Sequence, residues 1–72
     1  MAIGTVKFFK REKGWGAIAS EELPAGMDAF AHFSVIEGEG FRELTAGESV
    51  EFDFEPAQQD SFEFRATRVC RL

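Results

Sequence analysis

The sequence predicts an all-β fold in which five short strands close into a small barrel. The chain has 72 residues, enough for one domain with a small core, expected to span residues 1–72. Residues 49–55 alternate between polar and apolar side chains, as a half-buried strand does. The longest irregular stretch, residues 34–47, contains three glycines that exclude a long helix. Five short strands in so short a chain favour a closed barrel, because closure hides the strand edges.

Turn-forming residues separate the expected strands. Residues 10–14 are polar and end in glycine, as a hairpin turn does. The next two connections, residues 21–27 and 34–47, are rich in glycine or contain proline. Pro56 is expected to end the fourth strand, and residues 57–61 to form a polar loop. The expected strands are therefore residues 4–9, 15–20, 28–32, 49–55 and 62–72.

Alternation along these strands predicts which side chains enter the core. In the first strand Val6 points inward and Lys7 outward. The adjacent rings of Phe8 and Phe9 cannot both point outward in a regular strand, so a bulge or strong bend is expected near Phe8. The remaining inward-facing side chains are expected to be Val50, Phe52, Phe54, Phe64, Ala66 and Val69.

Aromatic side chains are expected on the outer surface of the sheet. The chain has nine phenylalanines and one tryptophan, and so small a core does not easily bury ten large rings. Trp15 and Ala17 share one face of the second strand, and Phe30 and His32 share one face of the third. If the opposite faces form the core, these rings and the nearby Lys13 form a stacking platform for unpaired bases. The alternative is that all of the rings fill the core.

The charge distribution supports the platform better than the total charge does. The net charge is −5, which by itself argues against a nucleic-acid-binding protein. Acidic residues concentrate between positions 37 and 63, whereas cations gather beside the expected platform. That basic cluster consists of Lys7, Lys10, Arg11 and Lys13, with only Glu12 opposing it.

Other classes of site lack the residues that they need. One cysteine, Cys70, forms no internal disulfide, and with a single histidine it provides no metal cluster. We expect Cys70 to be a small buried or edge residue; a disulfide-linked dimer under oxidation is the alternative. No nucleophile accompanies His32, so neither an enzyme nor a cofactor is expected. The N-terminus has no long apolar run, which predicts a cytoplasmic protein without a signal peptide or membrane span.

Two motifs resemble those of the bacterial cold-shock proteins. Residues 13–18, Lys-Gly-Trp-Gly-Ala-Ile, resemble the first ribonucleoprotein motif of that family, usually Lys-Gly-aromatic-Gly-Phe-Ile. Residues 28–33, Asp-Ala-Phe-Ala-His-Phe, resemble the second motif. Residues 4–9 resemble the opening strand, where the family often has tryptophan in place of Phe8. With similar segments at 38–41 and 47–52, the resemblance covers nearly the whole chain.

The resemblance implies a single cold-shock domain, a small closed five-stranded antiparallel barrel of the oligonucleotide-binding (OB) type. It also implies binding of single-stranded RNA or DNA with little sequence preference, and action as an RNA chaperone or a regulator of transcription or translation. The residues carried over to the binding surface are Lys7, Phe8, Lys13, Trp15, Phe30, His32, Phe33 and Phe41. Further candidates for that surface are Phe9, Lys10, Asp28 and Phe62.

Ala17 departs from the family pattern, because the family usually has phenylalanine there. In the expected register position 17 faces solvent, so one stacking surface is missing unless Trp15 spreads over the gap. Phe41 is expected either to close over a ligand or to plug the end of the barrel.

A different reading of the same aromatic face is a protein-interaction module. We favour the interpretation that the protein is a monomer and that its partner is single-stranded RNA or DNA. We expect it to bind no small-molecule substrate, no membrane and no metal.

Overall fold

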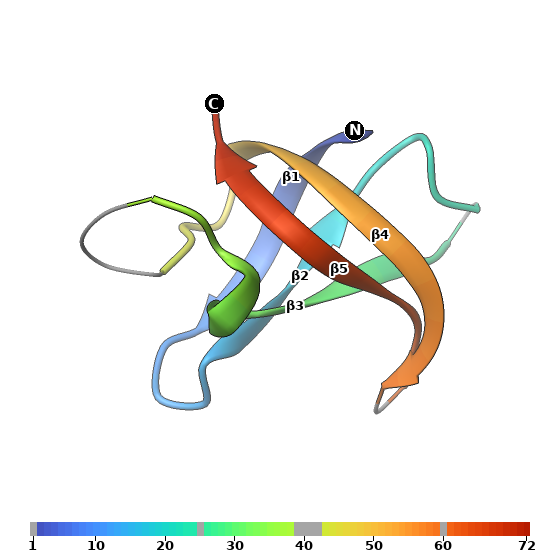
Figure 1. Cartoon of the computed structure of the whole chain (residues 1–72), viewed down its shortest axis with the longest axis horizontal. Coiled ribbons are helices and arrows are strands. Elements are labelled where there is room, and N and C mark those ends of the chain that lie inside the picture. The colour runs from blue at the N-terminus through green and yellow to red at the C-terminus, as the bar shows by residue number, and fades with distance from the viewer. Residues whose placement is uncertain (1, 25, 39–42, 60) are drawn as a thin grey trace.

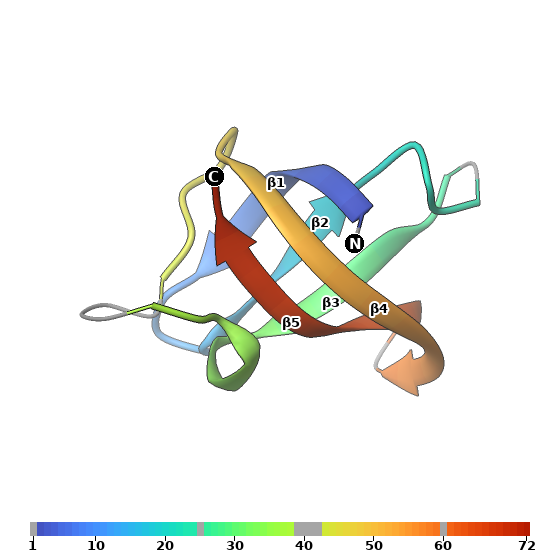
Figure 2. The ribbon, with the colours of Figure 1, turned by 45° about the horizontal axis from the view of Figure 1, so that its top comes forward.

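The computed structural model describes residues 2–24, 26–38, 43–59 and 61–72 (Figure 1). The described residues form a closed barrel in the order β1-β2-β3-β5-β4, which confirms the predicted all-β barrel. In Figures 1 and 2 the long, curved strands β4 and β5 cross in front of the other three. The elements are β1 (Ala2–Lys10), β2 (Trp15–Ala19), β3 (Asp28–His32), a short 3₁₀ helix η1 (Phe33–Val35), β4 (Ser49–Gln59) and β5 (Phe62–Arg71).

One seam of the five-stranded barrel is parallel, a detail that the predicted antiparallel barrel did not include. Strand β3 pairs with β5 in the same direction, with Ala29 opposite Phe64 and Phe30 opposite Arg65. The other four seams are antiparallel. An odd number of strands cannot alternate in direction around a closed ring, so one neighbouring pair must run parallel.

Strand β4 continues past Pro56, so the prediction that this proline ends the strand is wrong. Pairing between β1 and β4 stops at Phe52, whereas pairing between β4 and β5 extends to Gln59. Beyond Phe52 β4 therefore has one partner strand among the described residues. Proline has no N–H group to donate, so a strand tolerates it where one of its sides forms no ladder hydrogen bonds.

The predicted bulge in β1 is confirmed and separates two adjacent rings. The register between β1 and β2 shifts between Val6, opposite Ile18, and Phe8, opposite Ala17. As a result Val6 is buried in the core, Phe8 is exposed on the outer surface, and Phe9 packs against the core from within. The bulge reverses the alternation after Val6, so that Phe8 faces outward and Phe9 inward, whereas a regular strand would do the opposite.

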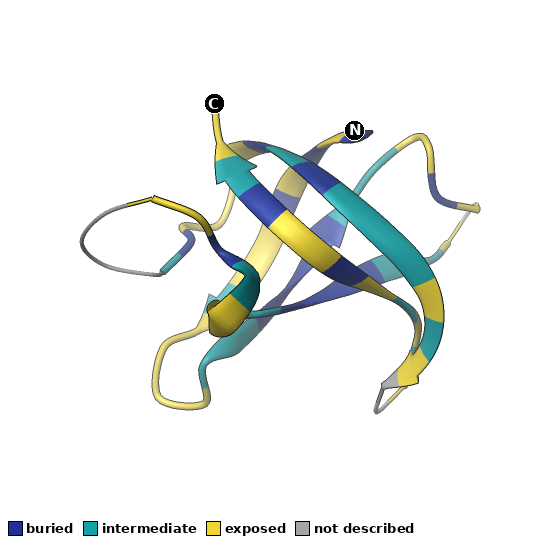
Figure 3. Ribbon diagram, in the orientation of Figure 1, coloured by how far each residue is buried: buried dark blue, intermediate teal, exposed yellow. Residues whose placement is uncertain are grey.

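The core is filled by the side chains that alternation predicts. Phe52, Ile18, Val6, Val50 and Val69 are its largest fully buried members. In Figure 3 buried positions along β5 are separated by exposed ones. The remaining predicted members of the core are Ala66, which is buried, and Phe54 and Phe64, which are partly buried against it.

Gly16 lets β1 and β2 approach closely behind the outer surface. A Cβ atom at this position would lie 2.3 Å from the carbonyl oxygen of Phe8 and 2.7 Å from Cδ1 of Phe9. No larger residue fits there without moving the backbone of β1. The glycine between Trp15 and Ala17 thus keeps both of these residues in register beside Phe8.

Candidate functional site

Four aromatic rings from four different strands meet on the outer surface of the barrel. We call Phe8, Trp15, Phe30 and Phe62 the aromatic cluster. The Trp15 indole lies at its centre, stacked on Phe30 with centroids 5.2 Å apart and planes 22° apart. Phe8 and Phe62 meet the indole edge-on at 5.7 Å and 5.9 Å. Offset-stacked and edge-on contacts are the arrangements that aromatic pairs prefer.

The alanine at position 17 lies beneath this cluster. Its neighbours across β1 and β3 are Phe8 and Phe30, and only 1% of its surface is exposed. Ala17 does not belong to the inner core cluster, and alternation with the inward-facing Ile18 places it on the outer face. The prediction that position 17 faces solvent is therefore wrong. Neighbouring side chains on the outer face therefore cover the place where the family usually has phenylalanine.

Phe30 is also more buried than its place on the platform suggests. It is 7% exposed, although it is not part of the inner core cluster either. Trp15 and Phe62 both contact its ring, with the Phe62 centroid 5.7 Å away. Phe30 thus lies on the predicted face, but its ring is covered by neighbouring rings.

A second pair of rings, His32 and Phe33, continues the surface beside Trp15. His32 is opposite Trp15 in the β2–β3 ladder, and its ring lies 4.5 Å from that of Phe33. The N–H of Ser34 donates to Nδ1 of His32 (3.3 Å), and the Ser34 hydroxyl lies 2.8 Å from the same atom. These contacts fix the orientation of the imidazole at the start of η1.

The left-handed backbone of Gly14 gives Phe33 its position. Gly14 has a φ of 77°, and a Cβ atom there would lie 2.9 Å from Cδ1 of Phe33. The N–H of Phe33 donates to the carbonyl oxygen of Gly14 at 2.8 Å. The hairpin turn therefore holds the Phe33 ring at the surface, where it is 43% exposed.

Two lysines near the rings have no carboxylate partner within the described parts of the chain. The Lys10 ammonium lies 5.2 Å from the Trp15 ring centroid and 5.8 Å from that of Phe8, within the range of cation–π attraction. Lys13 is exposed in the hairpin turn. Five other cations form ion pairs: Lys7 with Asp28, Arg11 with Glu43, Arg65 with Glu55, Arg68 with Glu37, and Arg71 with Glu48.

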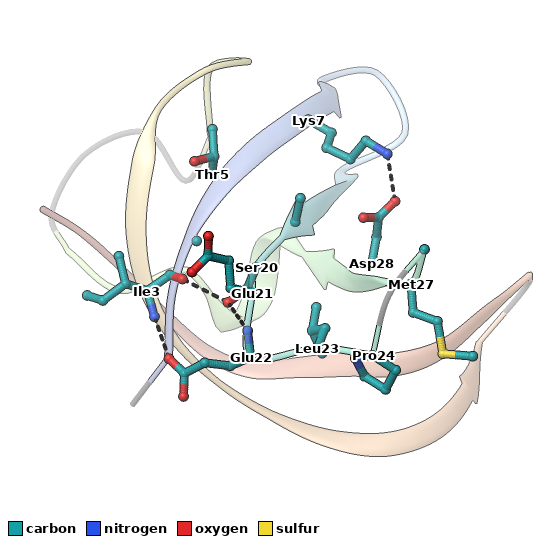
Figure 4. Close-up of a pocket in the computed structure, with 13 residues that line it drawn as sticks. Ile3, Thr5, Lys7, Ser20, Glu21, Glu22, Leu23, Pro24, Met27 and Asp28 are labelled. Atoms are coloured by element: carbon teal, nitrogen blue, oxygen red, sulfur yellow. Dashed lines mark hydrogen bonds and ion pairs between the residues drawn. The ribbon is translucent and has the colours of Figure 1, made fainter.

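The ion pair between Lys7 and Asp28 joins two residues that the sequence offered as candidates. Nζ of Lys7 lies 3.0 Å from Oδ2 of Asp28, at one end of a groove between β1 and the connection from β2 to β3 (Figure 4). At the other end Ile3 accepts a hydrogen bond from the Ser20 hydroxyl and donates one to Glu22. These bonds hold the connection against β1.

Two side chains on the β5 side of the barrel, outside the aromatic cluster, have shifted pKa values. A hydrogen bond from Arg68 lowers the pKa of Glu37 below its ordinary value, and the same bond raises the pKa of Arg68. The thiol of Cys70 lies 3.7 Å from Oε1 of Glu37. Cys70 is half-buried beside this ion pair and pairs with Glu51 in the β4–β5 ladder.

The remaining candidate residues have different positions. Phe9 packs against the core, so the structure places it behind the outer surface rather than on it. Phe41 lies outside the described residues. Phe62, one of the further candidates, is a full member of the aromatic cluster.

Arg65 and Thr67 line a groove between β3 and β5 beside Phe30 and His32. No local pattern marks these residues, because β3 and β5 are distant in the sequence and pair only briefly.

No group of three or more histidine, cysteine, aspartate or glutamate residues in the described ranges is arranged to hold a metal ion. No helix among these residues has the length and apolar character to cross a membrane.

Comparison with known proteins finds similarity along the whole chain. Residues 2–70 match the 'Cold-shock' DNA-binding domain. The chain is 47% identical to the cold shock-like protein CspLB of Listeria monocytogenes over 72 residues, which are all of both chains. It is 51% identical to the major cold shock protein of Streptococcus pyogenes serotype M1 over 70 residues, 97% of this chain and 100% of the relative. It is 55% identical to the major cold shock protein of Micrococcus luteus over 53 residues, 74% of this chain and 76% of the relative.

Proposed function

This chain belongs to the cold-shock DNA-binding domain family, whose members bind nucleic acids, and we propose that it binds single-stranded RNA or DNA with little sequence preference. The observation that carries the proposal is the row of rings on the outer surface of the barrel, from the aromatic cluster to Phe33, with Lys10 and Lys13 beside it. The protein acts as a cytoplasmic monomer without enzymatic activity, and serves as an RNA chaperone or a regulator of transcription or translation.

The chemistry of these groups suits unpaired strands. Every base has a π-face, so stacking on a ring contributes about 1–3 kcal/mol per base with little dependence on sequence. Lys10 and Lys13 supply charge for the phosphates that connect the stacked bases. A duplex already stacks and pairs its bases, so it gains little from the rings. Loose, reversible binding of this kind keeps RNA strands unpaired without an energy source.

The intrinsic fluorescence of Trp15 provides a direct test. We expect a short oligothymidine to quench the emission saturably, because a stacked base contacts the indole and the chain has no other tryptophan. Duplex of the same length should quench far less. The measurement is a fluorescence titration of the whole chain with single and double strands of matched length.

Two outcomes would count against the proposal in different ways. No saturable binding of any single strand would remove the function and favour the protein-interaction reading of the aromatic face. Saturable binding with unchanged Trp15 emission would keep the function but move the site elsewhere.

The salt dependence of binding should be shallow. Each phosphate contact on a single strand contributes a slope of about −0.7 to the plot of log affinity against log salt concentration. Lys10 and Lys13 can contact phosphates directly. Lys7 can do so only if the phosphate replaces Asp28 as its ion-pair partner. We therefore expect a total slope no steeper than about −3, which corresponds to at most four contacts. A titration between low and high salt measures this slope, and a much steeper one would show that charge rather than stacking drives binding.

A further inference from the structure

A groove outside the aromatic cluster runs between β1 and the connection from β2 to β3 (Figure 4). Its volume is about 950 Å³, and it is open to solvent. Of the residues that line it, only Lys7 and Asp28 were candidates for the nucleic-acid surface. The groove is therefore a second surface, and the proposed function does not use its remaining residues.

Apolar side chains line both walls of this groove. On the β1 side, Ile3 is 51% exposed, which is unusual for so large an apolar side chain in this barrel. Leu23, Pro24 and Met27 lie on the side of the connection (Figure 4). Leu23 is buried, whereas Pro24 is exposed and Met27 is half-buried. A ligand with apolar side chains would remove the exposed part of these walls from water, which favours binding.

Hydrogen bonds hold the two walls together at one end of the groove. The Ser20 hydroxyl donates to the carbonyl oxygen of Ile3 at 2.8 Å, and the N–H of Ile3 donates to Oε2 of Glu22 at 3.2 Å. The N–H of Glu22 donates to the same hydroxyl at 3.1 Å. The walls are thus in place before a ligand arrives, so that binding loses little free energy to ordering them.

The charged groups of the groove carry an excess of negative charge. Glu21, Glu22 and Asp28 line it together with one cation, Lys7. Lys7 pairs with Asp28 at 3.0 Å, whereas Glu21 and Glu22 have no cationic partner within the described parts of the chain. This excess repels the phosphates of a nucleic acid and attracts a cationic ligand.

We propose that this groove is a docking site for a basic, partly apolar peptide segment of another protein. Apolar side chains of the segment cover Ile3 and the opposite wall, and its cations pair with Glu21 and Glu22 at the rim. The wall along β1 extends from Ile3 to Lys7, which is about 13 Å for four residue steps of a strand. An extended segment of about five residues spans this length. The proposal does not depend on the proposed function.

The probe for the test is a fluorescein-labelled hexapeptide in which leucine and lysine alternate. In an extended chain its leucines share one face and can enter the groove, while its lysines remain near the rim. We expect saturable binding to the whole chain, measured by fluorescence anisotropy at low salt. A hexapeptide in which glutamate replaces each lysine should not bind.

Neutralising the rim tests the role of charge. In the double variant Glu21→Gln/Glu22→Gln, we expect the affinity for the probe to fall about 3- to 30-fold, as for the loss of two exposed ion pairs. The glutamine at position 22 still offers an oxygen to the N–H of Ile3. The matched control is Glu12→Gln/Glu63→Gln, which changes the net charge equally at two exposed glutamates outside the groove. Its affinity should stay within about 2-fold of the parent's.

A second pair of variants tests the apolar wall. Ile3→Ser should lower the affinity about 3- to 10-fold, because the leucines of the probe lose an apolar contact. Leu72→Ser is the control, since Leu72 is 69% exposed and does not line the groove. Its affinity should stay close to the parent's. Circular dichroism checks that each variant is folded.

Nuclear magnetic resonance locates the bound probe. We expect its addition to shift the amide signals of Ile3, Glu22 and Leu23, while those of Trp15 and Phe33 stay in place. Absence of saturable binding by the parent would overturn the inference, and so would equal losses in the two double variants. Signal shifts concentrated at Trp15 and Phe33 would also overturn it, and would favour the protein-interaction reading of the aromatic face.

Discussion

Phe52→Ala is expected to lower the free energy of unfolding by about 3–5 kcal/mol, the usual cost of removing a fully buried ring. Phe52 has no exposed surface and lies in β4 between Ala2 of β1 and Val69 of β5. Its ring also reaches the space in front of Gly4, where a Cβ atom would lie 2.8 Å from Cε1 of Phe52. Small domains are stable by about 5–15 kcal/mol in total, so this one substitution removes much of that stability.

Chemical denaturation followed by far-UV circular dichroism measures this effect. Phe33→Ala is the control, because its ring is 43% exposed and its loss leaves no cavity in the core. We expect the control to unfold at nearly the same denaturant concentration as the parent. A loss below about 1 kcal/mol for Phe52→Ala would mean that the barrel repacks around the vacant space.

Ala17→Phe is expected to destabilise the domain by about 1–3 kcal/mol and to leave single-strand binding no stronger than in the parent. If position 17 faced solvent, the opposite result would be expected, a new stacking surface and tighter binding. The burial of Ala17 decides between the two, because a ring at this position must displace the side chains that cover it.

The measurement pairs thermal unfolding with the affinity for a short oligothymidine. Ala46→Phe is a suitable control, since Ala46 is exposed in the turn before β4 and a ring there displaces nothing in the aromatic cluster. Tighter binding by Ala17→Phe with the stability of the parent would show that the outer surface has room for both rings.

Local patterns were sufficient to predict the strands, the inner face and the bulge. Alternation identified Val50 and Phe52 as buried, because neighbouring side chains in a strand must point to opposite sides. The adjacent Phe8 and Phe9 indicated an irregularity, because a regular strand cannot point both rings outward; the bulge is present, although it turns only Phe8 outward. The motifs around Trp15 and Phe30 likewise identified the face on which the rings meet.

Features that depend on several strands at once could not be predicted from local sequence patterns. The extension of β4 past Pro56 depends on where β1 ends, and the parallel seam follows from closing five strands into a ring. The ion pair of Lys7 with Asp28 joins residues from β1 and β3, so the number of available cations was smaller than the sequence suggested.

The sequence by itself therefore determined the strands and the chemical character of each face, because these depend on the order of neighbouring residues along the chain. Only the tertiary structure decided which rings on the outer face remain open. Ala17 and Phe30 are covered although both lie on the outer face, because rings from four strands converge there and minimise their exposed apolar surface. Alternation assigns a side chain to a face, whereas its exposure depends on neighbours that only the closed barrel brings together.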